Sequence, residues 1–229
     1  MPTDPVLPDN LTLEQSSVVA NNAMNRGRGL SGVNSYAREL GFDPYEMLAE
    51  RLRTDPTAEV TWIDVCCGSG RALLEAEQRF DREFPTADVR IIGLDLVDFF
   101  LDKPRTPRLR LLTTSATIWT PPREADLVTC VHGLHYIGDK LALIEAMTSW
   151  LVPHGLFAAD FDPAEIRRAN GSPVAEAVVE SLRAAGLTYD RRRIHGHGRP
   201  RFTATYLGAD PTAGPGYTGQ PSVASYYDW

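Results

Sequence analysis

The chain alternates between short apolar runs and longer segments in which apolar residues recur at helical spacing. An uninterrupted apolar run is typical of a strand that is buried on both faces of a sheet. Strands are expected at residues 60–65, 89–95, 108–114, 125–131 and 156–161, and helices from residue 71 and at residues 99–101, 139–151 and 174–185. Strands that alternate with helices predict a doubly wound α/β sheet whose strands are mostly parallel.

Ahead of the first strand, residues 1–57 are expected to form a helical cap or lid. Three segments in this region have helical spacing, and they lie at residues 13–24, 33–40 and 44–53. Between the first two segments, a loop with three glycines carries Arg26 and Arg28. Such a loop is either a flexible connection or a functional lid.

After the last predicted helix we expect a terminal antiparallel hairpin. Its strands are expected at residues 187–195 and 201–207, with a glycine-rich turn at residues 197–200. Residues 208–229 are rich in Gly, Pro and Ser but also hold several aromatic residues, which disordered tails seldom carry. We therefore expect this aromatic tail to pack back on the α/β domain of residues 58–207 or on a partner subunit.

Composition and charge narrow the class of protein. The net charge of −7 argues against a dedicated nucleic-acid-binding protein, which usually carries a basic face. Cys66, Cys67 and Cys130 fit neither a disulfide framework nor the spacing of zinc ligands, so we expect a reducing cytoplasmic setting and no metal. No apolar run approaches the ~18 residues of a membrane span. The sequence leaves open whether the protein forms a homodimer.

A glycine-containing loop follows the first strand and organises the rest of the chain. Gly68 and Gly70 would form a tight turn at the start of the next helix, where ligands of doubly wound sheets bind. Asp64 lies inside the strand, where a carboxylate needs donors or a cationic ligand group, unless it only ties down the turn. A phosphate-binding loop is absent, and Leu73 replaces the third glycine of the dinucleotide motif, which disfavours a nicotinamide oxidoreductase.

A second acidic residue, Asp95, ends the second predicted strand at the same edge of the sheet. A carboxylate at this place can accept hydrogen bonds from both hydroxyls of a ribose. Asp64 and Asp95 in register favour a nucleoside ligand more than either alone. A solvated acid at a strand end is the other interpretation of Asp95.

Residues 64–70, Asp-Val-Cys-Cys-Gly-Ser-Gly, resemble the first motif of the class I S-adenosylmethionine-dependent methyltransferases, with Cys66 where the first glycine is usual. The resemblance covers residues 60–162 and implies a Rossmann-like sheet that the terminal antiparallel pair completes, S-adenosylmethionine as cofactor and S-adenosylhomocysteine as product. Ser115 stands where the family commonly places an Asp that accepts from the adenine amino group, and Tyr36 is the candidate contact to the methionine end. The implied cofactor residues are Tyr36, Asp64, Cys66, Cys67, Gly68, Gly70, Asp95, Leu96, Ser115, Ala116 and Val131.

Two histidines follow the fourth predicted strand, where the resemblance places the methyl acceptor. The cofactor carries most of the reactivity in methyl transfer, and the protein positions the acceptor and removes a proton where the acceptor has to lose one. His132 and His135 are the candidate catalytic residues, because imidazole titrates near neutral pH. A structural role for either histidine is the alternative.

The acceptor class is narrowed by the motifs that the chain lacks. No Asn/Asp-Pro-Pro-Tyr/Phe follows the fourth strand, and no Pro-Cys pair suited to cytosine methylation is present. We therefore expect a small, partly apolar metabolite, with an oxygen, nitrogen or carbon acceptor unresolved. The alternatives are an RNA- or protein-directed methyltransferase that uses Arg26, Arg28 and residues 191–193, and a non-catalytic S-adenosylmethionine-binding scaffold.

Overall fold

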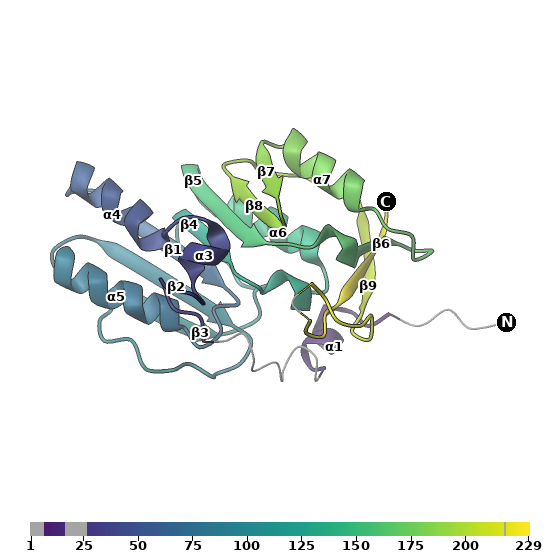
Figure 1. Cartoon of the computed structure of the whole chain (residues 1–229), viewed down its shortest axis with the longest axis horizontal. Coiled ribbons are helices and arrows are strands. Elements are labelled where there is room, and N and C mark those ends of the chain that lie inside the picture. Colours follow the sequence, from purple (N-terminus) through teal and green to yellow (C-terminus); the bar gives the residue numbers. More distant parts are fainter. Residues whose placement is uncertain (1–6, 17–26, 218) are drawn as a thin grey trace.

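The structure is a computed structural model that describes residues 7–16, 27–217 and 219–229. One seven-stranded sheet has the order β3-β2-β1-β4-β5-β8-β7 (Figure 1). All of its strands point the same way except β8, which is antiparallel to both of its neighbours. The predicted doubly wound, mostly parallel sheet with a terminal antiparallel pair is therefore confirmed. The strands are β1 (Val60–Val65), β2 (Val89–Asp95), β3 (Leu109–Thr113), β4 (Ala125–Cys130), β5 (Leu151–Asp160), β7 (Leu187–Asp190) and β8 (Arg193–Gly196).

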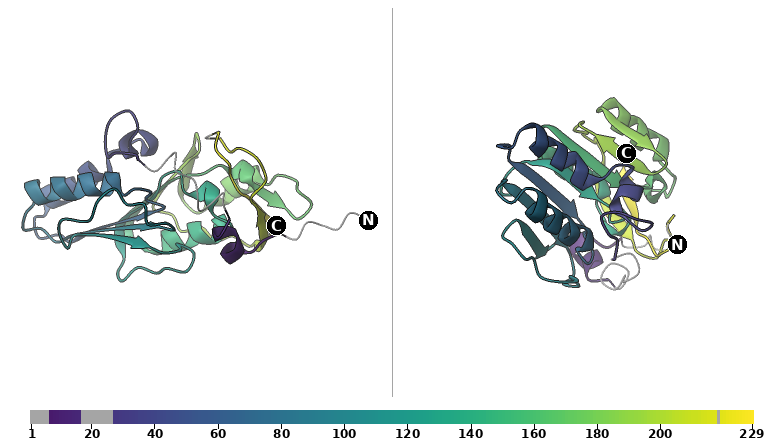
Figure 2. Two further views of the ribbon diagram at one scale, coloured as in Figure 1. Left: turned by 90° about the horizontal axis from the view of Figure 1, so that it is seen from below. Right: turned by 60° about the vertical axis from the view of Figure 1, so that its left-hand side comes forward.

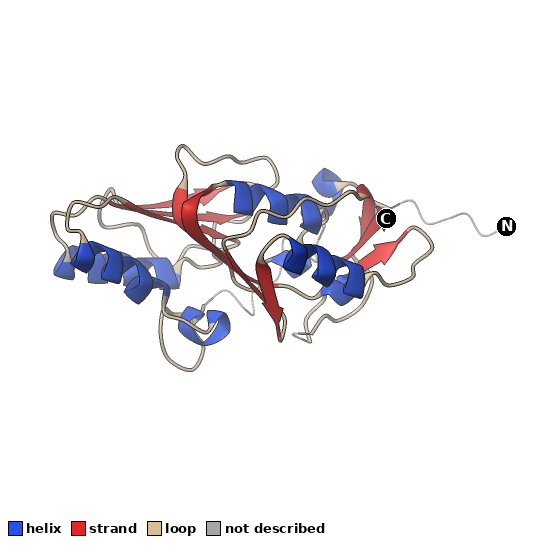
Figure 3. Cartoon of the chain, turned by 90° about the horizontal axis from the view of Figure 1, so that it is seen from above, coloured by secondary structure: helices blue, strands red, loops and turns tan. Residues whose placement is uncertain are grey.

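Helices lie on both sides of this sheet (Figure 3). Along β1 the side chains alternate between two apolar layers: Trp62 packs in the cluster that includes residues of α4 and α5, and Ile63 packs in the cluster that includes residues of α6. Because successive positions meet one layer or the other, every residue of β1 and of β4 is buried. The helices are α1 (Asn10–Glu14), α3 (Tyr36–Leu40), α4 (Pro44–Thr54), α5 (Arg71–Glu83), α6 (Lys140–Ser149) and α7 (Ala175–Ala184), with short 3-10 turns η1 (Leu134–Tyr136) and η2 (Pro163–Glu165).

The direction of winding reverses between β1 and β4. The chain goes from β1 outward to β2 and β3, and then crosses back so that β4 and β5 lie on the other side of β1. Ligands of doubly wound sheets bind beyond the carboxyl ends of the strands at such a reversal. Cys66 follows β1 and Val131 follows β4, so the reversal brings the glycine loop beside the segment that carries His132.

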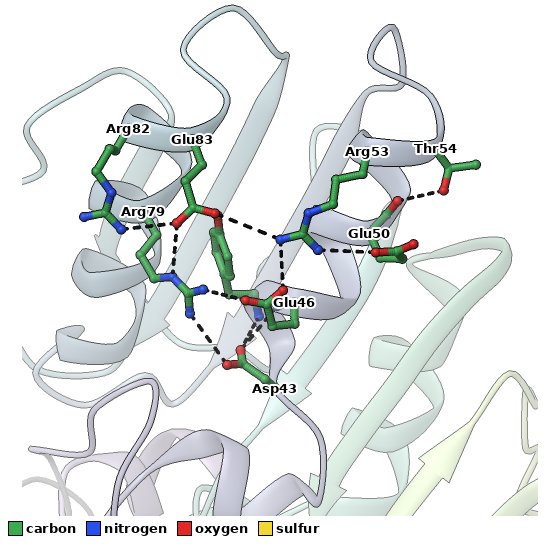
Figure 4. A network of polar contacts seen from close by, with 9 residues as sticks. Asp43, Glu46, Glu50, Arg53, Thr54, Arg79, Arg82 and Glu83 are labelled. Atoms are coloured by element: carbon green, nitrogen blue, oxygen red, sulfur yellow. Dashed lines mark hydrogen bonds and ion pairs between the residues drawn. The ribbon is translucent and has the colours of Figure 1, made fainter.

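A network of charged side chains joins α4 to α5 on the surface (Figure 4). Arg79 of α5 pairs with Glu46 of α4 at 2.5 Å, and its guanidinium lies 3.6 Å from the centre of the Tyr45 ring. The Tyr45 hydroxyl in turn donates to Glu83 at 2.6 Å. Single exposed ion pairs stabilise little, but a network built around a buried ring holds the two helices in one arrangement. The helical region ahead of β1 is thereby anchored to the sheet.

The helix predicted at residues 13–24 is described only in part. Leu13 and Glu14 belong to α1 (Asn10–Glu14), which begins three residues earlier than predicted, and residues 17–26, including Arg26, lie outside the described residues. The helix predicted at residues 99–101 is wrong, because the Leu101 amide donates to the Ser69 carbonyl of the glycine loop at 2.8 Å instead. No helix in the described parts of the chain is both long enough and apolar enough to cross a bilayer.

The terminal hairpin is shorter than predicted and turns at a different place. β7 pairs with β8 directly, and the turn consists of Arg191 and Arg192, with φ of 48° and 69°. The predicted turn at residues 197–200 and the pairing of residues 201–207 with this hairpin are therefore wrong. Alternation of apolar residues identifies a strand but not its partner, and β9 (Thr205–Asp210) pairs elsewhere.

A second, three-stranded sheet has the order β6-β10-β9 and was not predicted. It combines β6 (Ile166–Arg168) with β9 and with β10 (Ala224–Asp228). This sheet lies at the end of the molecule opposite α4 and α5 (Figure 2). Tyr227 of β10 is buried, and its hydroxyl donates to Asp139 at 2.9 Å and accepts from the Leu141 amide at 3.2 Å. The aromatic tail is therefore bonded to the start of α6.

Lys140 is fully buried where the tail crosses α6, with 0% of its surface exposed. Its ammonium donates to the Ile137 carbonyl at 2.8 Å, the Val223 carbonyl at 2.7 Å and the Ser225 hydroxyl at 3.0 Å. Glu165 lies 3.6 Å away and completes an ion pair. Burial lowers the pKa of Lys140 and raises that of Glu165, and the charge of each partner opposes the shift of the other.

Replacing Lys140 by Met should destabilise the protein by ~3–5 kcal/mol, because it leaves Glu165 and two carbonyls buried without their partner. The matched control is Lys103→Met, which removes the exposed lysine of the same chain and should change stability by no more than ~0.5 kcal/mol. Urea unfolding measures both. Equal stabilities of the two variants would contradict a structural role for the buried ammonium.

Candidate active site

A cavity opens beyond the carboxyl ends of β1, β2 and β4, at the reversal of winding. Most of the residues predicted to bind the cofactor line it, and so does one of the two predicted catalytic histidines. Asp64, Gly70 and His135 do not line it. The predicted residues in its wall are Tyr36, Cys66, Cys67, Gly68, Asp95, Leu96, Ser115, Ala116, Val131 and His132.

The glycine loop has the conformation of a ligand-binding turn. Gly68 and Gly70 have φ of 61° and 69°, in the left-handed region that favours glycine. Gly70 has no side chain to cap the first turn of α5, so the amides of that turn have no side-chain acceptor from the cap position. A loop of this kind at a helix N-terminus favours a bound anionic group.

Cys66 stands where the resembled motif has its first glycine, and its backbone conformation is one that favours glycine. Its φ is 59°, which costs a residue with a Cβ of order 1–3 kcal/mol. A Cβ built on Gly133 would lie 2.4 Å from the Cys66 Cβ, so Gly133 makes room for this side chain. A hydrogen bond with Cys130 raises the pKa of the Cys66 thiol well above its usual value, and the thiol is therefore protonated at neutral pH.

Asp95 is held by backbone donors at the end of β2. Gly68 donates to its Oδ2 at 2.8 Å and Val97 donates to its Oδ1 at 3.1 Å. A carboxylate has about four lone-pair positions and can accept hydrogen bonds from several donors at once. The half-buried carboxylate borders the cavity and has the geometry to accept from two adjacent hydroxyls of a ligand.

Asp64 is buried behind the cavity wall and accepts a hydrogen bond from Tyr36. The Tyr36 hydroxyl donates to its Oδ2 at 2.7 Å, and the Thr129 hydroxyl donates to its Oδ1 at 2.5 Å. Burial raises the pKa of Asp64 to about 7, although both hydrogen bonds oppose the shift. The donors that a buried carboxylate needs are thus side-chain hydroxyls, and Asp64 positions a tyrosine ring that does line the cavity.

At the other side of the cavity, Ser115 is paired with an acid from the N-terminal helix. The Ser115 hydroxyl donates to Glu14 at 2.5 Å and lies 2.7 Å from the Thr117 hydroxyl. Glu14 and Asn10 of α1 also line the cavity. A carboxylate therefore lies beside the serine, although the sequence has no Asp at this position after β3.

His132 follows β4 and lies at one end of the cavity, next to the end of β5. Its Nδ1 is 2.8 Å from the hydroxyl of Tyr217, and its Nε2 is 3.2 Å from Glu39 Oε2 and 3.5 Å from Asp160 Oδ2. Burial raises the pKa of Asp160 to about 6, and the His132 ring beside Glu39 keeps the pKa of Glu39 below its usual value. Both ring nitrogens of His132 therefore face protein side chains.

His135 is buried behind His132, with the two ring centres 6.3 Å apart. Burial lowers the pKa of His135 to about 3, so this imidazole is neutral at physiological pH. Its backbone carbonyl accepts from the Val223 amide of the tail at 2.9 Å. The structure thus separates the two predicted histidines, and only His132 reaches the cavity.

Several residues of this site were not predicted. Asp160 could have been found, because it ends β5 at the same edge of the sheet at which Asp95 ends β2. Glu39 and Tyr217 carry no signal in the sequence, since they reach His132 from helix α3 and from the C-terminal segment. The remaining unpredicted residues in the wall include Asn10, Glu14, Arg28, Tyr136 and Gly138.

Comparison with known proteins assigns the domain. Residues 34–208 match a family model described as a methyltransferase domain. A trans-aconitate 2-methyltransferase from Methylobacterium radiotolerans is 32% identical over 121 residues, which are 48% of this chain and 44% of the relative. The aligned part thus spans less than half the length of the curated relative.

Two crystal structures are similar to the chain at low identity. A magnesium protoporphyrin IX methyltransferase from Synechocystis PCC 6803 has a TM-score of 0.49 and 14% identity, with 82% of this chain and 96% of the other covered. The [4+2]-cyclase SpnF has a TM-score of 0.47 and 19% identity, with 80% and 74% covered. Both TM-scores are below 0.5, so neither structure bears on the substrate.

Replacing Gly133 by Ala should cost ~1–3 kcal/mol, because the new Cβ overlaps the Cys66 side chain while the φ of −101° at Gly133 suits alanine. In a Cys66→Gly background the same replacement should cost ~1 kcal/mol less. A double-mutant cycle by urea unfolding measures this coupling. Additive effects would show that the two loops are not in contact.

Asp64 predicts a dependence of stability on pH. Its folded-state pKa of about 7 lies above the ordinary value of 3.8, so the stability that it contributes is fully present below about pH 4 and is lost as pH rises through 7. The stability of the wild type relative to Asp64→Asn should therefore fall by ~1.4 kcal/mol per pH unit within this window. Unfolding at several pH values measures the difference. In the control variant Asp98→Asn, which changes an exposed carboxylate, the free energy of unfolding should vary with pH as it does in the wild type. A constant difference would contradict the raised pKa.

Proposed function

This chain belongs to the class I S-adenosylmethionine-dependent methyltransferases, and from that premise we propose that it transfers the methyl group of S-adenosylmethionine to a small, partly apolar molecule. The observation that carries the proposal is one cavity that joins the glycine loop, the carboxylate ending β2 and the histidine that follows β4. When bound, S-adenosylmethionine supplies an electrophilic methyl group on a sulfonium. The chain has to hold this cofactor, orient the acceptor and exclude water.

Asp95 and the glycine loop hold the nucleoside and amino-acid parts of the cofactor. The Asp95 carboxylate accepts backbone hydrogen bonds from Gly68 and Val97 and borders the cavity, where it would accept from the two ribose hydroxyls. The left-handed backbone at Gly68 lets a ligand approach the loop closely. Tyr36, fixed by Asp64, closes the cavity from the side of the N-terminal helices.

Ser115 and Glu14 together bind the adenine. Ser115 alone is a weaker acceptor than the aspartate that the family commonly has at this place. Glu14 adds a carboxylate, and its hydrogen bond to Ser115 keeps that carboxylate at the cavity wall. The exocyclic amino group of adenine has two donors, which suits an acceptor pair of this kind.

His132 is the residue that acts on the methyl acceptor, since it is the predicted catalytic histidine that borders the cavity. His135 supports it from the buried side. The similarity to a relative that is named for trans-aconitate, a small acid, supports a small acceptor over a macromolecule. In addition, Arg192 in the turn between β7 and β8 pairs with Asp162 at 3.3 Å and lies over the Tyr217 ring. Its guanidinium is thus already engaged within the protein, which disfavours the RNA-directed alternative.

The Asp95→Asn variant should bind S-adenosylmethionine and S-adenosylhomocysteine at least tenfold more weakly than the wild type. Hydrogen bonds to a charged acceptor exceed those to a neutral one by roughly 1 kcal/mol each, and two are lost. Isothermal titration calorimetry measures the affinities, with NAD as the ligand control. Asp98→Asn, an exposed carboxylate three residues along the chain, should keep the wild-type affinity. Unchanged binding by Asp95→Asn would contradict the assignment of Asp95 to the nucleoside site.

A further inference from the structure

Three side chains from distant parts of the chain converge next to the cavity. Glu39 comes from α3, His132 follows β4, and Asp160 ends β5. One ligand atom of each lies within 4.8 Å of the others, with His132 Nε2 at 3.2 Å from Glu39 and 3.5 Å from Asp160. Two carboxylates and one imidazole arranged around a common point are ligands that divalent first-row metal ions prefer.

Two of these ligand atoms are buried without a hydrogen bond. Neither His132 Nε2 nor Asp160 Oδ2 has a hydrogen-bond partner within the described part of the chain. The two residues are only 8% and 6% exposed. Glu39 Oε2 and Asp160 Oδ2 approach Nε2 only at ion-pair distances of 3.2 and 3.5 Å, so a ligand placed among the three atoms would satisfy them.

The contact at the other nitrogen of His132 is compatible with a metal ligand. Tyr217 Oη lies 2.8 Å from Nδ1, and a hydroxyl can accept from Nδ1–H. That arrangement leaves the Nε2 lone pair free and directed at the two carboxylates. Tyr217 also stacks on the imidazole, with ring centres 5.6 Å apart, which restricts rotation of the ring.

The positive side chains nearby leave room for a cation. Arg28 Nε lies 3.6 Å from Glu39 Oε1, so it engages the carboxylate oxygen that faces away from His132. Arg193 is the strand partner of Asp160, and its guanidinium donates to the Arg38 carbonyl at 2.8 Å. Glu39 Oε2 and Asp160 Oδ2 are the oxygens that remain turned toward Nε2.

We propose that Glu39, His132 and Asp160 bind a divalent first-row metal ion, Mn²⁺ or Zn²⁺, and that this ion holds the methyl acceptor. The proposal rests on the proposed function and specifies how His132 acts in it. Three protein ligands leave coordination positions open, and His132 connects the site to the cavity. The acceptor class is then a small molecule with two adjacent oxygen donors, such as a vicinal diol or a 2-hydroxy acid.

The metal would prepare an oxygen of the acceptor for methylation. Coordination lowers the pKa of a hydroxyl, whose proton leaves to water at the cavity mouth. An oxygen lone pair then forms the new O–CH₃ bond while the C–S bond breaks and its electrons remain on sulfur as a neutral thioether. No external oxidant or reductant is needed. The sequence predicts no metal, because none of the three ligands is spaced from another in a recognisable motif.

The test is titration of the full-length protein with Mn²⁺, followed by the loss of the free-ion signal in electron paramagnetic resonance. The wild type should bind one Mn²⁺ per chain, and pulsed spectra should show coupling to one imidazole nitrogen. Glu39→Gln and Asp160→Asn keep the side-chain volumes and should each weaken binding at least tenfold. His154→Ala removes an exposed histidine and should leave binding unchanged.

Two outcomes would overturn the metal site. One is the absence of stoichiometric binding of Mn²⁺ or Zn²⁺ at millimolar concentration, with His132 found by NMR as an imidazolium paired to both carboxylates. The other is binding that Glu39→Gln and Asp160→Asn leave unaltered. S-adenosylmethionine affinity, measured on the same samples, separates this failure from that of the proposed function, since Glu39→Gln should not change it.

Discussion

The buried carboxylate of Asp64 is the constraint on which the site depends. An ionisable group in the middle of a parallel strand has to be given donors, and the backbone of β1 cannot supply them because its amides pair with the neighbouring strands. Thr129 of β4 and Tyr36 of α3 supply them instead. The first ties together the two strands at the reversal of winding. The second fixes α3 against the sheet and thereby places Glu39, one turn after Tyr36, beside His132.

A second buried charge does the same for the C-terminal segment. Lys140 at the start of α6 needs acceptors, and the carbonyl of Val223 and the hydroxyl of Ser225 provide two of them. The tail is therefore part of the fold, and its path carries Tyr217 to His132. Helix α3 and the C-terminal segment thus reach the same histidine, and each is bonded to a buried ionisable side chain, Asp64 or Lys140.

Backbone strain occurs where β1 and β4 end, as it does in the turn between β7 and β8. Cys66 and His132 both have positive φ, and Gly133 accommodates the Cys66 side chain between them. Non-glycine residues are held in this conformation only when their surroundings determine it. Here the surroundings are two adjacent parallel strands whose loops touch, and the result is an imidazole held in one orientation at the end of the cofactor cavity.

The sequence by itself determined the sheet, the glycine loop and the acid at the end of β2. These features follow from local patterns: apolar runs, glycines where a turn is needed, and an Asp placed at a strand end. The tertiary structure alone decided which strand the residues after 200 pair with, that Glu14 joins Ser115, and that Glu39, Asp160 and Tyr217 surround His132. Those contacts join residues far apart in the chain, and they are set by the donors and acceptors that buried charges require, which no spacing along the sequence records.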